Sequence, residues 1–126
     1  MRFSLRVLLV AIGGAAGAYV RWRLAVHYPA APGAFPTTTF CINVAGAALL
    51  GYLVGRVPVR DDRTEAVRLT LGTGVLGGFT TFSTFAVETA RRLPHHAPTA
   101  LTYAAASTTA GVVAAVVGLA VGAATQ

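Results

Sequence analysis

The sequence predicts an all-α membrane protein with four transmembrane helices. Only 11% of its 126 residues are charged and the mean hydropathy is +0.65, whereas a soluble domain carries about 25% charged residues. Four apolar segments each approach the roughly 20 residues that a helix needs to cross a bilayer. All ten basic residues are arginines, and they lie in small groups near the ends of these segments. That placement is typical of membrane interfaces, so we expect lipid as the surrounding medium and no nucleic-acid partner.

The four predicted spans run over residues 6–27, 36–57, 65–93 and 98–124 and form one domain of residues 1–126. The connections "YPAAPGA", "PVRDD" and "PHHAP" contain prolines, glycine or charges, which are loop signals. The first segment begins like a signal peptide, but its apolar character continues to Val20, so we interpret it as a span. No connection is long enough for a catalytic domain, and an enzyme is not expected.

Each span contains two glycines four residues apart, an arrangement that lets helix backbones approach closely. The pairs are Gly13 with Gly17, Gly51 with Gly55, Gly74 with Gly78, and Gly118 with Gly122. We therefore expect tight helix packing throughout. Four short helices leave little room for a pathway within one copy, which favours a dimer.

The arginines encode the orientation only weakly. If the N-terminus is cytoplasmic, six arginines lie on that side and four on the other. Basic residues normally show a stronger preference for the cytoplasmic side. The sequence therefore fits a chain that inserts in both orientations, and equally one that inserts with its N-terminus inside at moderate efficiency.

The third span contains "GGFTTFSTF", residues 77–85, where two poor helix formers precede hydroxyl side chains that compete for backbone hydrogen bonds. We expect a break in the helix within residues 77–81. Unpaired backbone groups at membrane depth are tolerated only when they are buried in protein or line a wet cavity. The segment is therefore either an ion site built from backbone groups or a packing seam of glycine and threonine. The residues involved are Gly77, Gly78, Thr80, Thr81, Ser83 and Thr84.

Aromatic residues recur at every third position of this segment, at Phe79, Phe82 and Phe85. Phe82 and Phe85 share a helix face, and Ser83 and Thr84 lie between them. Ring edges are positive, so rings beside hydroxyls can accept a small anion without a fixed positive charge. The alternative is that the rings simply contact lipid or the protein core.

Polar residues also occur at helical spacing in two other spans. Asn43 follows Thr39 by four residues in the second span, and Ser107 follows Tyr103 by four in the fourth. The Asn43 amide offers two N–H donors to an ion. The alternative for both pairs is hydrogen bonding between helices.

The motifs "GGFTTFSTFAVE", "INVAGAALLG" and "GAAGAYVRW" closely resemble the Fluc (CrcB) family of fluoride channels, and the likeness spans the chain. This resemblance implies a passive channel that exports fluoride across the bacterial inner (plasma) membrane. It also implies an antiparallel, dual-topology dimer with two pores and a third helix broken near the midplane.

The resemblance also implies roles for individual residues. Phe82 and Phe85 would line the pore and Asn43 would donate its amide to fluoride. The carbonyls of Gly77 and Thr80 would hold a structural Na⁺ at the dimer axis, and Arg21 would lie near the vestibule. Thr39, Ser83, Thr84, Tyr103 and Ser107 match hydroxyl positions along the path.

Two positions leave questions open. Gly111 stands where relatives often carry a further hydroxyl, which puts the outer end of the polar track on the fourth span in doubt. Glu88 matches a glutamate common after the phenylalanines, but it also lies three and four residues before Arg91 and Arg92. An ion pair within the helix is as plausible there as a role in the pore. Arg21 could likewise reach the headgroups rather than a vestibule.

Two further functions compete with a homodimeric channel. One is a subunit of a heterodimeric fluoride channel, paired with a paralogous chain. The other is a small proton-coupled exporter, which needs a carboxylate within the first span. The first span has no Asp or Glu, so we favour a channel, as a homodimer before a heterodimer.

Overall fold

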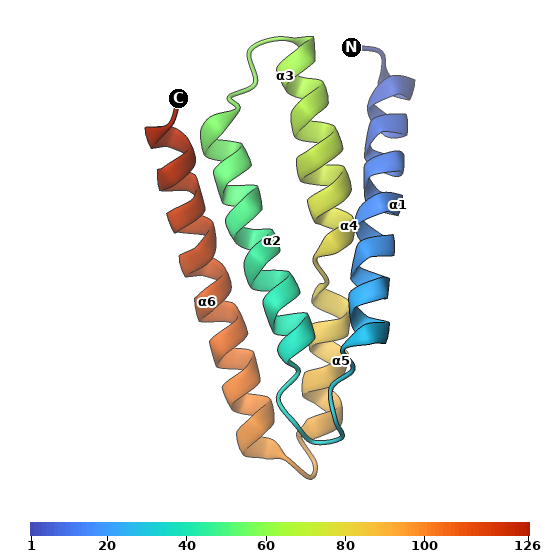
Figure 1. Cartoon of the computed structure of the whole chain (residues 1–126), viewed down its shortest axis with the longest axis vertical. Coiled ribbons are helices and arrows are strands. Elements are labelled where there is room, and N and C mark those ends of the chain that lie inside the picture. Colours follow the sequence, from blue (N-terminus) through green and yellow to red (C-terminus); the bar gives the residue numbers. More distant parts are fainter.

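The computed structural model describes all 126 residues, and it is all-helical. Three helices are continuous: α1 (Phe3–His27), α2 (Thr37–Arg56) and α6 (Ala97–Ala124). The remaining segment is divided into α3 (Asp62–Val67), the π-helix η1 (Arg68–Leu76), α4 (Gly77–Phe79) and α5 (Phe82–Arg92). Both termini and the α2–α3 connection lie at one end, and the other two connections lie at the opposite end (Figure 1).

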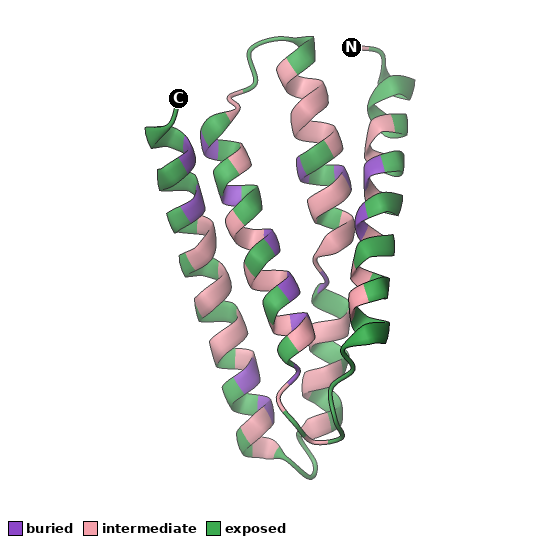
Figure 2. Cartoon of the chain, viewed as in Figure 1, coloured by how far each residue is buried: buried purple, intermediate pink, exposed green.

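The surface of the chain is that of a membrane protein. The continuous helices α1, α2 and α6 are each long and apolar enough to cross a membrane. Only 15 of the 126 residues are buried, and large apolar side chains are exposed along every continuous helix (Figure 2). Soluble monomers rarely expose extensive apolar surface of this kind. The fold is therefore a multi-pass helical bundle, as the composition predicts.

The helices pack as two pairs, α2 with α6 and α1 with η1 and α4. Glycine makes both contacts possible. A Cβ atom added to Gly118 of α6 would lie 2.9 Å from the Tyr52 nitrogen of α2. One added to Gly17 of α1 would lie 2.8 Å from the Phe79 nitrogen of α4. These distances are shorter than van der Waals contact, so the backbones touch, and the predicted close packing is confirmed.

The third segment departs from a regular helix in two places. The π-helical stretch of η1 was not predicted, and such stretches are uncommon and often lie near functional sites. Beyond α4, Thr80 has ψ 157° and Thr81 has φ −149° and ψ 117°, so both are extended. The interruption is narrower than the predicted interval 77–81, because Gly77 and Gly78 are helical. Gly78 instead provides close contact, since a Cβ there would lie 3.0 Å from the Gly14 Cα of α1.

Short polar side chains cap the first turns of α5 and α3. The Thr84 amide donates to Thr81 Oγ1 at 3.1 Å, which caps α5. At the start of α3, Asp61 and Thr64 form a reciprocal capping box. Hydrogen bonds from the Thr64 amide and hydroxyl hold the pKa of the Asp61 carboxyl below its ordinary value of 3.8.

Candidate functional site

The interruption in the third segment is bound by Asn43 of α2. The Asn43 Nδ2 donates to the Thr81 carbonyl at 2.9 Å, and the Thr81 amide donates to Asn43 Oδ1 at 2.8 Å. A side-chain amide thus replaces the helical partners that the extended peptide has lost. Because Nδ2 carries two hydrogens, one N–H of Asn43 remains available.

Hydroxyl groups surround the same peptide. The Thr81 hydroxyl donates to Thr84 Oγ1 at 2.9 Å and lies 3.4 Å from Ser83 Oγ. The Thr80 hydroxyl turns back to the Leu76 carbonyl at 2.9 Å. Thr81 is buried, whereas Ser83 is exposed. The Thr84 hydroxyl accepts the Thr81 bond, which leaves its own hydrogen free to donate.

An open cleft of about 300 Å³ lies beside this peptide and contains no charged side chain. The Phe82 ring borders it and is 79% exposed. The cleft is lined by Asn43, Gly46, Ala47, Leu50, Thr80, Thr81 and Phe82. It therefore offers the free N–H of Asn43 and a ring beside apolar walls, with no cation of its own, while the Thr80 and Thr81 hydroxyls donate within the chain.

The carbonyls that precede the interruption have different partners. Arg21 Nε donates to the Gly78 carbonyl at 3.1 Å. The Thr80 carbonyl accepts no hydrogen bond from this chain, and no side chain donates to the Gly77 carbonyl. Arg21 is thus held against the third segment, and its place near a vestibule stays a prediction. Gly77 is exposed in the single chain, so its carbonyl is open to a ligand or a partner.

A row of aromatic rings leads away from the cleft. The Phe82 and Phe85 centroids are 5.7 Å apart, and those of Phe85 and Tyr103 are 5.2 Å apart. The row continues through Phe35, 5.3 Å from Tyr103, to Phe40, 5.4 Å further on. Sequence reasoning missed Phe35 and Phe40, because no spacing along the chain relates a loop residue to rings on α5 and α6.

The Glu88 carboxylate lies beside this row and accepts two hydroxyl hydrogen bonds. Thr39 donates to one carboxylate oxygen at 3.0 Å and Tyr103 to the other at 2.7 Å. Arg92 instead donates to the Glu88 backbone carbonyl at 2.9 Å and to the Ala34 carbonyl at 2.8 Å. The alternative of a local ion pair with Arg91 or Arg92 is therefore wrong, because the ion pairs of this chain lie elsewhere.

The structure separates the two predicted hydroxyls of the fourth span. Tyr103 is fully buried and joins the Glu88 group. Ser107 Oγ is buried without a hydrogen-bond partner, one turn further along α6. Next along the helix, Gly111 has no atom within 4 Å of the position that a Cβ would take. Within one copy of the chain, Tyr103 is therefore the only one of these three positions on α6 that joins a hydrogen-bonded group.

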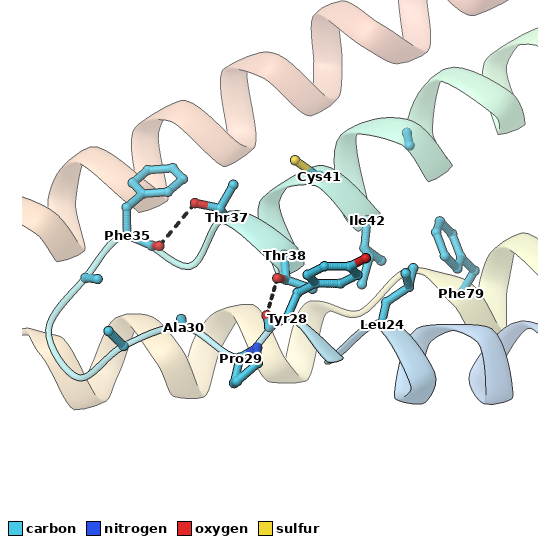
Figure 3. A pocket seen from close by; sticks show the side chains of 13 residues that line it. Leu24, Tyr28, Pro29, Ala30, Phe35, Thr37, Thr38, Cys41, Ile42 and Phe79 are labelled. Atoms are coloured by element: carbon cyan, nitrogen blue, oxygen red, sulfur yellow. Dashed lines mark hydrogen bonds between the residues drawn. The ribbon is translucent and has the colours of Figure 1, made fainter. Parts of the chain in front are cut away.

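A larger cavity of about 740 Å³ lies elsewhere, between the end of α1, the α1–α2 connection and the start of α2 (Figure 3). Its walls are mostly apolar, with Tyr28, Ile42 and Phe79 facing it (Figure 3). Thr38 bridges α2 to the Tyr28 carbonyl at its edge. The lining includes neither Asn43 nor Phe82 nor Glu88. The larger cavity is therefore separate from the polar groups around Asn43 and Glu88.

Comparison with known proteins identifies the family. Residues 8–119 match the family described as CrcB-like protein, Camphor Resistance (CrcB). A protein of Novosphingobium aromaticivorans named fluoride-specific ion channel FluC is 46% identical over 116 residues, covering 89% of this chain and 91% of that protein. Fluoride-specific ion channel FluC 1 of Symbiobacterium thermophilum is 44% identical over 120 residues, covering 91% and 95%. These are names of ion channels and not of enzymes, and the chain belongs to the CrcB family.

Proposed function

We propose that this chain forms a fluoride-selective passive channel that exports fluoride from the cytoplasm. The observation that carries the proposal is the uncharged cleft beside the interruption. A free N–H of Asn43 and the exposed ring of Phe82 border it, and the Thr84 hydroxyl, which is bonded to Thr81, keeps a hydrogen free to donate. The names of the family relatives support fluoride as the ion.

The physical chemistry favours a row of weak ligands over one strong site. Moving a small anion into an apolar medium costs tens of kcal/mol in lost hydration, and one hydrogen bond to a charged group returns only about 1.5–3 kcal/mol. Asn43, Thr84 and the edges of Phe82 and Phe85 can replace hydration in steps. Conduction also requires that the ion leaves again. The absence of an arginine from the cleft lining fits that requirement.

The Gly77 and Thr80 carbonyls fit the expected Na⁺ site. Oxygen atoms are the ligands that hard cations prefer, and unwound carbonyls hold Na⁺ in membrane proteins. The Thr80 carbonyl lacks a donor in this chain and the Gly77 carbonyl has no side-chain donor, so the two would hold the ion together with their counterparts in a second copy. Bound there, Na⁺ would supply fixed positive charge. Asn43 keeps the neighbouring peptide extended, which leaves the Thr80 carbonyl outside the helical ladder.

We infer an antiparallel homodimer in the inner membrane, with the Thr80–Thr81 interruption near the midplane. Exposure of the Phe82 ring and of Gly77 supports this arrangement, because a second copy would cover both. The alternative is a heterodimer with a paralogous chain. It is favoured by the numbered relatives, since Streptomyces avermitilis has proteins named FluC 2 and FluC 3.

The test uses purified protein in liposomes loaded with fluoride. We expect efflux once a potassium ionophore balances the charge, with little movement of chloride. Phe82→Ile should lower efflux sharply. Phe3→Ile is the matched control, because Phe3 is 81% exposed but lies at the opposite end of the chain from the ring row. Equal efflux from the parent and the Phe82 variant would contradict the pore, and no efflux from this chain alone would favour the heterodimer.

A further inference from the structure

Both termini and the α2–α3 connection lie at one end of the molecule (Figure 1), and six arginines belong to these segments or to the adjoining helix turns. They are Arg2, Arg6, Arg56, Arg60, Arg63 and Arg68. Three acidic side chains lie at the same end. Which arginines remain uncompensated depends on how these acids are used.

All three acidic side chains are bound within the chain. Asp61 caps α3 by accepting from the Thr64 amide at 2.8 Å. Asp62 accepts from the Met1 ammonium group at 2.9 Å. Glu65 forms an ion pair with Arg6 at 3.0 Å. None of the three forms an ion pair with the other arginines of this end.

Four arginines at this end form no direct contact with an acidic group, although the charge of Arg63 helps to lower the pKa of Asp61. The Arg68 guanidinium donates to the Val54 and Val57 carbonyls at 3.3 and 3.2 Å, so it is used to close the end of α2. The side chains of the other four are exposed and form no hydrogen bond or ion pair. They are Arg2, Arg56, Arg60 and Arg63.

The opposite end of the molecule differs in this respect. Arg21 donates to the Gly78 carbonyl, Arg23 to the Tyr19 hydroxyl at 3.0 Å, and Arg92 to two carbonyls. Only Arg91 has no partner there. The uncompensated guanidinium groups are therefore concentrated at the end with the termini.

The position of these groups fits the headgroup layer of a membrane. Arg56 is the last residue of the spanning helix α2, and Arg63 lies in the first turn of α3. Between them Val59 is 56% exposed, which suits contact with the acyl boundary. Guanidinium groups bind phosphate oxygens in a fork, and each basic residue near an anionic surface strengthens lipid binding.

We propose that Arg56, Arg60 and Arg63 bind the phosphate of an anionic phospholipid headgroup. The Gln126 side chain contacts the Gly55 carbonyl, the residue before Arg56. Arg60 and Arg63 are further along the chain from that contact and are the sharper targets. This proposal is independent of the ion that the chain conducts.

The test counts bound lipid by native mass spectrometry of the full chain in detergent, titrated with phosphatidylglycerol or with phosphatidylcholine. We expect preferential binding of phosphatidylglycerol to the parent. The double variant R60Q/R63Q should bind it roughly 30-fold more weakly, because about 1 kcal/mol per arginine is about fivefold. The matched control R23Q/R91Q removes the same charge from the opposite end and should retain most of the affinity.

The other outcomes are equally decisive. R60K/R63K keeps the charge but loses the guanidinium fork, so its affinity for phosphatidylglycerol should lie between those of the parent and of R60Q/R63Q. Equal losses in R60Q/R63Q and R23Q/R91Q would reduce the effect to net charge and overturn the proposal. Displacement of the lipid by soluble glycerol phosphate would assign the arginines to free phosphate instead.

Discussion

The two helix pairs of this protein use the same glycine spacing but differ in their backbones. In the α2–α6 pair, both helices run unbroken through the contact, and Gly118 lies against Tyr52. In the pair formed by α1 and the third segment, Gly17 and Gly78 make equally close contacts. There, however, the third segment passes through a π-helix and ends its ladder at Thr80 and Thr81.

This difference shows what glycine does in each pair. Glycine allows close approach in both, and it remains helical even at Gly77 and Gly78. The helical hydrogen bonds of the third segment are instead interrupted at the threonines. There, Asn43 of α2 supplies both an acceptor and a donor to the Thr81 backbone. A packing seam and an interrupted helix are therefore separate features that happen to adjoin in one of the two pairs.

The largest expected effect is at Asn43. Asn43→Ala removes both hydrogen bonds to Thr81 and leaves an unsatisfied backbone N–H and C=O, which costs about 1–3 kcal/mol each. We expect fluoride efflux to fall about a hundredfold or more. Thr108→Ala is the control in the unbroken pair, because Thr108 only donates to the Ala104 carbonyl of its own helix. Liposome efflux compares the two variants, and equal rates would remove Asn43 from the pathway.

The glycine contacts should give the next largest effect. Gly17→Ala and Gly118→Ala place a methyl group against a neighbouring backbone, and such overpacking costs about 1–3 kcal/mol of unfolding free energy. Gly111→Ala meets open space and should stabilise the helix by up to about 1 kcal/mol. Denaturant unfolding in detergent measures all three.

The same variants sharpen the comparison between the pairs. Only Gly17 lies in the pair that contains Thr80 and Thr81, so only Gly17→Ala should lower efflux per folded molecule. A matching loss of efflux in Gly118→Ala would show that both seams position the pathway.

A smaller effect is expected from the hydroxyl of Tyr103. Tyr103→Phe keeps the ring between Phe85 and Phe35 but removes the hydrogen bond to Glu88. One charge-assisted bond contributes about 1.5–3 kcal/mol, so we expect efflux to fall roughly tenfold. Tyr19→Phe removes a hydroxyl that contacts only Arg23 and should leave efflux unchanged. Unchanged efflux from the Tyr103 variant would show that Glu88 needs only Thr39.

The smallest effect concerns the start of α3. The pKa of Asp61 is below its ordinary value of 3.8 in the folded chain because the ionised carboxylate accepts from the Thr64 amide and hydroxyl. The capping contribution is therefore fully present above about pH 5 and is lost as the pH falls through the lowered pKa. The protection of the α3 amides, measured as exchange relative to the intrinsic rate at the same pH, should fall in acid, and in Asp61→Asn this protection should not change with pH. A pH response that persists in that variant would show that the Asp61 carboxyl is not its source.

Much of the candidate site was predictable because its residues are unusual for their surroundings. Asn43, the threonines and the spaced phenylalanines are conspicuous in an apolar chain, and polar groups in lipid need partners. The identity of each partner was not predictable. The bond between Asn43 and the Thr81 peptide joins residues 38 positions apart, and the Thr39 and Tyr103 bonds to Glu88 span 49 and 15 positions.

By itself the sequence determined that the chain is a helical membrane protein with four apolar segments. Hydropathy and the placement of charges are local properties of the chain, and they decide which segments can enter a bilayer. It also determined where helices could touch, through the glycine spacing. Only the tertiary structure decided where the third helix is interrupted, which carbonyls stay free, and which arginines stay uncompensated. Each of these depends on whether a residue far away in the sequence forms a hydrogen bond or an ion pair with the atom in question. The spacing of residues along the chain does not show which distant residues come that close.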